Sequence, residues 1–238
     1  MSIINNRIIR SGGNHHDNVV GLILMGAVSC GKKTQMKKLL NDEDYEGVHI
    51  DLGEEIRQKL ISDPHFSRQH EHLVSSGRLL PDPVVLNLVA EKARQIRQKG
   101  IIGLDGFCRN RCQADMIGHI FTRPDNLLAV EFEVDFDIVM QRAPSRGRSD
   151  DNMAQSRYKL WQDNRNGVFR KLSAKGVKVV SVNANGTPDF VFEQFHQHVR
   201  NHVLHLKSLS DQKQRSGSSS RVLTHPHSGP WEDSEHHH

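Results

Sequence analysis

The chain has 238 residues, of which 36% are hydrophobic, and its 32 Lys and Arg side chains against 28 Asp and Glu give a net charge of +4. This length suits one α/β domain or two small ones, and so weak a positive charge, with no dense basic patch interleaved with aromatic residues, argues against nucleic acid as a partner. Three cysteines argue against a disulfide scaffold. The sequence shows no secretory signal and no stretch of about 18 consecutive apolar residues. We therefore expect a cytoplasmic protein with no membrane partner.

Both ends of the chain are expected to lie outside the folded domain. Residues 1–18 are polar and rich in Asn, Gly and His, which predicts a flexible lead. Residues 207–238 include a Ser/Gly-rich stretch without apolar periodicity, which predicts a disordered tail. The final residues His236 to His238 fit either a tag remnant or native sequence. The folded domain is therefore expected over residues 19–206.

Five short apolar runs predict buried parallel strands. In chain order these runs are 19–25, 48–50, 101–104, 127–134 and 177–182. Amphipathic segments separate them. The segment 81–99, for example, places Val85, Leu88 and Ile96 on one helical face and stops at Gly100. This alternation predicts an α/β fold, a five-stranded parallel sheet with helices on both faces, whose ligands bind at the carboxyl ends of the strands.

The first predicted strand leads into a glycine-bounded loop, a lysine and a helix-prone segment. The loop comprises Gly26, Ala27, Val28, Ser29, Cys30, Gly31, Lys32, Lys33 and Thr34. Strand, loop, lysine and helix occur in this order in phosphate-binding P-loops, where backbone N–H groups and the helix N-terminus converge on phosphate oxygens. Most such loops place Ser or Thr directly after the lysine, whereas Lys33 here precedes Thr34. The alternative interpretation is a glycine-rich turn without a ligand.

Two further groups of residues suit phosphate chemistry. Asp105 follows a predicted buried strand, where a P-loop protein uses a carboxylate to order the water shell of Mg²⁺, although Asp105 alone also fits a turn or N-cap. Arg109, four residues later, can form paired hydrogen bonds to a phosphate. Four more arginines surround Asp150 and Asp151, and they fit either closure over a transferring phosphoryl group or a solvated loop. These are Arg142, Arg146, Arg148 and Arg157.

Taken together and in order, these motifs resemble the adenylate kinase family, which moves a phosphoryl group between ATP and AMP. The resemblance covers about residues 19–205. The matching segments are Gly26 to Thr34, Leu52 to Arg57, Gly77 to Pro81, Asp105 to Arg109 with Gln113, Arg142 to Asp151, and Arg157 to Trp161. The resemblance implies a monomer with the three-layer P-loop NTPase fold. It also implies a small helical insertion for the nucleoside monophosphate at about 52–81 and a minimal lid at about 143–151.

The resemblance further implies a role for each matched residue. The loop from Gly26 to Thr34 would bind ATP, with Lys32 on its phosphates and Arg142 against its adenine. The AMP-binding residues would be Leu52, Gly53, Arg57, Leu79, Leu80, Gly106, Arg109 and Gln113, with the arginines on the phosphate and Gln113 reading the base. The catalytic residues would be Lys32, Arg109, Arg146, Arg148 and Arg157. Asp105 would order water around Mg²⁺, the cofactor that accompanies ATP.

Departures from the family pattern leave two other functions open. Leu52 replaces a Thr of the acceptor site and Asn110 follows Arg109, so a kinase for UMP, CMP or another nucleoside monophosphate is the first alternative. Val28 and Ser29 replace Pro-Gly and Lys33 replaces Gly in the loop, so a non-catalytic nucleotide-binding protein is the second. Ser29 would be strained by about 1 kcal/mol if its φ is positive.

Two other groups of residues have metal-compatible spacing. Cys108 and Cys112 lack a second cysteine pair, so we expect small buried side chains rather than a metal site. His198, His202 and His205 share one face of the last helix, and we expect that face to be solvated. The lid segment carries no Cys/His cluster, so no zinc-binding lid is expected.

Overall fold

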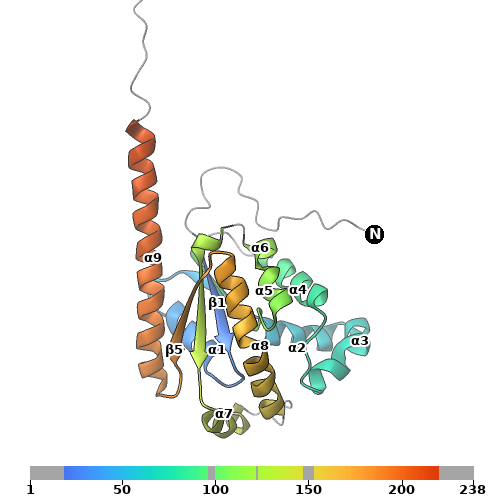
Figure 1. Ribbon diagram of the computed structural model, residues 1–238. Coiled ribbons are helices and arrows are strands. Elements are labelled where there is room, and N and C mark those ends of the chain that lie inside the picture. The colour runs from blue at the N-terminus through green and yellow to red at the C-terminus, as the bar shows by residue number, and fades with distance from the viewer. Residues whose placement is uncertain (1–18, 96–99, 122, 147–152, 220–238) are drawn as a thin grey trace, which may run out of the picture.

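The computed structural model describes residues 19–95, 100–121, 123–146 and 153–219, and a five-stranded parallel sheet lies at its centre (Figure 1). The strands are β1 (Val19–Gly26), β2 (Gly47–Asp51), β3 (Gly100–Asp105), β4 (Leu127–Glu133) and β5 (Lys178–Asn183). Their order across the sheet is β2-β3-β1-β4-β5, and every neighbouring pair is parallel. The structure confirms the predicted fold class, and each strand ends within one residue of its predicted limits.

The helices cover the sheet in two groups and add a smaller lobe. They are α1 (Lys32–Leu40), α2 (Leu52–Ser62), α3 (Pro64–Ser75), α4 (Asp82–Gln95), α5 (Arg111–Asp115), α6 (Ile117–Ile120), α7 (Phe136–Arg142), α8 (Ala154–Ala174) and α9 (Pro188–Ser219), with 3₁₀ turns η1 (Pro124–Asn126) and η2 (Pro144–Arg146). Helix α1 packs against α9, while α5 packs against α4 and α8. Helices α2 and α3 pack on each other and lie to one side of the sheet (Figure 1).

The core explains why the central strands could be predicted from their apolar runs. Strands β1, β3 and β4 are buried over nearly their whole length, since helices cover both faces of a parallel sheet. Phe132 of β4 packs against Phe195 of α9 at a centroid distance of 5.4 Å, and both side chains are fully buried. In the described part of the chain, no helix is long and apolar enough to cross a membrane.

The C-terminal helix is longer than predicted. Helix α9 continues to Ser219, so residues 207–219 are helical and the prediction of a disordered tail from residue 207 was wrong for this stretch. Its first part is anchored by Val191, Phe195 and Val199 in the core. Extending a helix from a packed turn adds one hydrogen bond per residue, so the helix continues past the sheet through a mostly polar segment (Figure 1). Residues 1–18 and 220–238 lie outside the described residues.

The sheet brings three strand ends to one edge. β1 runs into the glycine-bounded loop, β2 ends at Asp51 and β3 ends at Asp105. Asp51 and Asp105 are direct partners in the parallel register of β2 and β3. The predicted loop and the predicted carboxylate therefore meet at the carboxyl edge of the sheet, together with a second carboxylate from β2.

Candidate active site

An open cavity of about 580 Å³ lies at this edge of the sheet and joins the glycine-bounded loop to helix α2 and the loop after β3. Predicted site residues that line it are Val28, Ser29, Cys30, Gly31, Lys32, Lys33, Thr34, Leu52, Gly53, Arg57, Leu79, Leu80, Asp105, Gly106, Arg109, Gln113, Arg142 and Arg157. Gly26 and Ala27, the first two residues of the loop, are not among the residues that line the cavity, and their carbonyl oxygens accept hydrogen bonds from Lys32. Arg146 ends η2, and Arg148 lies outside the described residues together with most of the predicted lid.

The loop depends on glycine at two places. Gly26 has φ 132°, and a Cβ there would lie 2.7 Å from the Phe132 carbonyl oxygen. Gly31 has φ 97° and forms the N-cap of α1. Ser29 also has a positive φ, of 59°. A residue with a Cβ is strained by about 1 kcal/mol in this conformation, so Ser29 carries the backbone strain that was considered from the sequence. Both glycines and Ser29 thus turn the backbone so that it curls over the N-terminus of α1.

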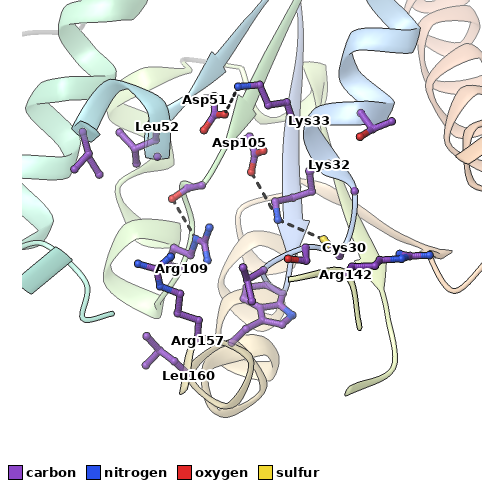
Figure 2. A pocket seen from close by; sticks show the side chains of 18 of the residues that line it. Cys30, Lys32, Lys33, Asp51, Leu52, Asp105, Arg109, Arg142, Arg157 and Leu160 are labelled. Atoms are coloured by element: carbon purple, nitrogen blue, oxygen red, sulfur yellow. Dashed lines mark hydrogen bonds and ion pairs between the residues drawn. The ribbon is translucent and has the colours of Figure 1, made fainter. Parts of the chain in front are cut away.

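Lys32 lies inside this loop with 7% of its surface exposed. Its ammonium donates to the carbonyl oxygens of Gly26 and Ala27 at 3.3 and 3.0 Å and lies 3.3 Å from the Cys30 Sγ. The Asp105 Oδ1 is 3.8 Å away (Figure 2). A buried ammonium held mainly by neutral carbonyls gains a stronger, charge-assisted partner when a phosphate enters the loop. Lys32 is therefore placed to bind an anion in the cavity.

Lys33 points away from the loop and toward helix α2 (Figure 2). Its ammonium lies 3.2 Å from the Asp51 Oδ2 and 3.9 Å from the Glu54 Oε2. The other Asp51 oxygen accepts the Glu54 N–H at 3.1 Å and so caps α2. Burial alone would raise the pKa of Asp51, but the hydrogen bond from the Glu54 N–H and the nearby Lys33 ammonium outweigh burial and lower this pKa.

Asp105 is the carboxylate that lies beside Lys32. It is 7% exposed and faces the cavity, with Lys32 on one oxygen and the His49 Nε2 at 4.0 Å from the other. The His49 Nε2 is buried and has no hydrogen-bond partner among the described residues. Burial lowers the pKa of His49 and outweighs the opposing effects of Asp105 and Asp51. A carboxylate in this position fits water-mediated binding of Mg²⁺ beside a phosphate.

Two arginines mark the other half of the cavity. Arg57 of α2 donates to the Glu54 Oε2 at 2.9 Å, and a Cβ on Gly53 would lie 3.4 Å from the Arg57 guanidinium. Arg109 donates to the Gly106 carbonyl oxygen at 3.4 Å. Gly106 has φ 85°, and a Cβ there would lie 3.4 Å from the Leu52 Cβ. The loop after β3 thus comes close to the start of α2, which brings both guanidinium groups to the same part of the cavity.

Gln113 is already held at both ends of its amide. Its Oε1 accepts the Arg109 N–H and its Nε2 donates to the Asp82 Oδ1, each at 2.9 Å. Asn110 caps α5 through the Gln113 N–H and also donates to Asp82. Gln113 is 1% exposed. A side-chain amide carries two N–H hydrogens and two acceptor lone pairs. In Gln113 one hydrogen and one lone pair are used by Asp82 and by the backbone of Arg109, so one of each remains for a base.

The remaining arginines contact backbone carbonyls from other segments. Arg142 donates to the carbonyl oxygens of Ala184, Gly186 and Asn185 at 2.9, 3.1 and 3.4 Å. It therefore holds the loop after β5 at the rim of the cavity. Arg157 of α8 donates to the Val74 carbonyl oxygen at 3.4 Å and links α8 to the end of α3. Both arginines line the cavity, from the side opposite Asp51.

The structure corrects two expectations about Cys and His. Cys108 is completely buried, and burial raises its pKa, but Cys112 is exposed rather than buried. His202 is 2% exposed, so the prediction of a solvated face was wrong for this residue, because α9 turns it toward the core. Burial is the largest cause of its lowered pKa. The described residues contain no group of three or more His, Cys, Asp or Glu side chains able to hold a metal.

Sequence reasoning missed several contributors to the site. On β2, Asp51 lies beside Lys33 and His49 lies beside Asp105. Asp82 at the start of α4 holds Gln113. Asp51 offered a usable signal, since a carboxylate directly after a predicted strand belongs to the same edge as Asp105. Asp82 and the carbonyls that hold Arg142 offered none, because backbone acceptors carry no residue signature.

Comparison with known proteins gives a consistent result. The family model for adenylate kinase matches residues 24–182. An adenylate kinase from Encephalitozoon cuniculi is 31% identical over 182 residues, which cover 75% of this chain and 97% of the relative. The adenylate kinase of Corynebacterium urealyticum is 28% identical over 72% of this chain and 94% of its own, and that of Prochlorococcus marinus is 25% identical over 71% and 93%.

Proposed function

Because the chain belongs to the adenylate kinase family of nucleoside monophosphate kinases, we propose that it reversibly transfers the γ-phosphoryl group of ATP to AMP and forms two ADP. The single observation that carries this proposal is one cavity that joins the P-loop lysine to two arginines from other segments. Lys32 would hold the donor phosphates, and Arg57 and Arg109 would hold the acceptor phosphate. A binder of one nucleotide would need only the first of these.

The donor half of the cavity fits ATP with Mg²⁺. Loop N–H groups and Lys32 supply the phosphate contacts, and Arg142 with the backbone after β5 forms the rim where the base would lie. Asp105 would hold water ligands of Mg²⁺, and the cation would neutralise charge that develops on the phosphates. The exposed hydroxyl-bearing residue Thr34 lines the same half and would complete the ATP site.

Catalysis would consist of positioning and charge neutralisation. An acceptor phosphate is already an anion, so the transfer needs no dedicated general base. Arg109 of the acceptor half and Arg157 of α8 both line the cavity, and their guanidinium groups would neutralise the transferring phosphoryl group. Arg146 and Arg148 would join them from the lid at about 143–151. Helices α2 and α3 would form the part that binds the monophosphate, at about 52–81.

The identity of the acceptor base separates the proposed function from its first alternative, a kinase for UMP or CMP. Leu52 is buried and has no hydroxyl group to offer a base, so base recognition would depend on Gln113 and on the backbone at Leu79 and Leu80. The remaining donor and acceptor of the Gln113 amide suit the adenine edge. UMP or CMP is the alternative acceptor. Asn110 does not favour it, because its side chain caps α5 and binds Asp82.

A non-catalytic nucleotide-binding protein is the second alternative. Ser29, whose φ is positive, and Lys33 both stand where the family pattern has glycine. Against this alternative, Lys32, Arg57, Arg109 and Arg157 all line the cavity. We propose further that the enzyme acts as a monomer in the cytoplasm without nucleic acid or membrane partners.

The deciding experiment is an acceptor panel. Purified full-length protein is mixed with ATP, Mg²⁺ and one of AMP, UMP, CMP, GMP or dAMP, and nucleoside diphosphate formation is followed by chromatography. We expect AMP to give the highest kcat/KM and omission of Mg²⁺ to abolish turnover. Higher kcat/KM with UMP or CMP would establish the first alternative. ATP binding without product from any acceptor would establish the second.

A further inference from the structure

The two consecutive lysines of the loop serve two different carboxylates. Lys32 lies 3.8 Å from Asp105, and Lys33 lies 3.2 Å from Asp51, the neighbour of Asp105 in the sheet. The Lys33 side chain is 55% exposed and lines the cavity. It starts on the helix that follows the donor loop but ends at the helix of the acceptor side (Figure 2). Although Lys33 belongs to the loop expected to bind ATP, its ammonium therefore lies unlike that of a lysine that contacts the donor phosphates.

Charge balance at the start of α2 depends on Lys33. The group contains two carboxylates, Asp51 and Glu54, and two cations, Lys33 and Arg57, linked by ion pairs of 2.9 to 3.9 Å. Glu54 is shared, because its Oε2 contacts both Arg57 and Lys33. Without Lys33 the group has one excess negative charge, and Glu54 has only the Arg57 guanidinium to pair with among these four. The excess negative charge and the exclusive pairing of Glu54 with Arg57 both weaken the binding of a phosphate beside Arg57.

We propose that Lys33 is a positioning residue of the acceptor site, which neutralises Asp51 and Glu54 and thereby keeps Arg57 available for the phosphate of the acceptor nucleotide. This inference rests on the proposed function for the identity of the acceptor. Lys33 acts on Arg57 through Asp51 and Glu54 and does not touch the reacting atoms. The P-loop helix would thus contribute to both nucleotide sites, through Lys32 on the donor side and through Lys33 on the acceptor side.

A purely structural role predicts something different. Exposed ion pairs contribute little to stability, about 0–1 kcal/mol, and Lys33 is more than half exposed. Asp51 would still cap α2 without Lys33, because its capping oxygen is not the one that faces the lysine. Under our proposal, removal of Lys33 should therefore leave the free energy of unfolding nearly unchanged and weaken the binding of the acceptor nucleotide selectively.

The test measures binding of AMP and of ATP separately, by calorimetry, to the full-length protein. We expect Lys33→Ala to raise the Kd for AMP roughly three- to tenfold, the effect of one unit charge at a partly exposed site, and to change the Kd for ATP less than about twofold. Lys37→Ala is the matched control, since Lys37 is exposed on the same helix. This control should change neither constant. Lys33→Arg, which keeps the charge, should retain most of the AMP affinity.

A second variant separates charge balance from loss of a contact. Asp51→Asn keeps a capping oxygen for α2 and removes one negative charge. Added to Lys33→Ala, it should return the Kd for AMP toward the wild-type value. Unchanged AMP binding in Lys33→Ala, an equal loss of ATP binding, or no rescue in the double variant would each overturn the inference.

The outcomes also keep this inference separate from the proposed function. Wild-type protein that binds AMP and ATP but forms no ADP would contradict the proposed function, while the binding data would still decide the role of Lys33. Active wild-type protein with unaltered AMP binding in Lys33→Ala would contradict the inference alone. Wild-type protein without measurable AMP binding would overturn both.

Discussion

The two halves of the cavity, which we propose bind the donor and the acceptor nucleotide, are constructed differently. The donor half is one continuous segment, in which β1, the P-loop and α1 place Lys32 against backbone carbonyls. The acceptor half is assembled from α2, the loop after β3 and α4, and its polar side chains hold one another through Asp51, Glu54 and Asp82. In a site built from backbone groups, most side chains can change and the effect is concentrated in one cation, Lys32, whereas a side-chain network is sensitive to each member.

The largest expected effect lies in the donor half. Lys32→Ala should lower kcat/KM at least about 10³-fold, because it removes a preorganised charge from the transferring phosphates. Steady-state kinetics with ATP and AMP measures this loss, and Lys37→Ala on the same helix is the control. A kcat/KM within tenfold of wild type would mean that the backbone N–H groups of the loop, and not Lys32, provide most of the binding energy for the donor phosphates.

The next effect belongs to the acceptor half. Arg57→Ala and Arg109→Ala should each lower kcat/KM for the acceptor about 10²-fold, since each removes a charge-assisted contact to its phosphate. Binding of ATP, measured by calorimetry, should remain close to wild type for Arg57→Ala. A matched loss of ATP affinity in that variant would contradict the division of the cavity into two halves.

A smaller effect tests how well the donor loop is built. Ser29→Gly should raise the free energy of unfolding by up to about 1 kcal/mol, because glycine adopts the positive φ of 59° without strain. Chemical denaturation followed by circular dichroism measures the change. Ser156→Gly in helix α8 is the control and should instead destabilise the protein. If Ser29→Gly is destabilising, contacts of the serine side chain outweigh the backbone strain.

The extents of the strands, the P-loop and Asp105 could be predicted because each has a local signature. Short apolar runs mark the strands. Glycine, lysine and a strand-end carboxylate identify the loop and its partner. The pairing of Lys33 with Asp51, of Gln113 with Asp82 and of Arg142 with three carbonyls could not be predicted. These contacts join residues far apart in the chain, and tertiary packing alone decides them. Helix α9 is longer than predicted, because a helix whose first turns are packed in the core can extend through polar residues.

The smallest effect concerns the pH dependence of the acceptor half. The pKa of Asp51 is lowered in the folded protein, so its stabilisation is complete above the unfolded pKa of about 3.9 and is lost as the pH falls through the folded value. Asp51→Asn should therefore lose less stability than wild type when the pH is lowered from about 5 to 3. Denaturation midpoints across this range provide the measurement. Parallel curves for both proteins would show that Asp51 is not stabilised by its partners.

The central claim is direct phosphoryl transfer between two nucleotides in one cavity. The most direct measurement supplies ATP labelled in its γ-phosphate together with AMP labelled in its base and separates the products. The account predicts that both labels appear in the same ADP molecule, and that Lys32→Ala and Arg109→Ala each suppress this product. Release of the γ-label as inorganic phosphate, with AMP unchanged, would contradict the account.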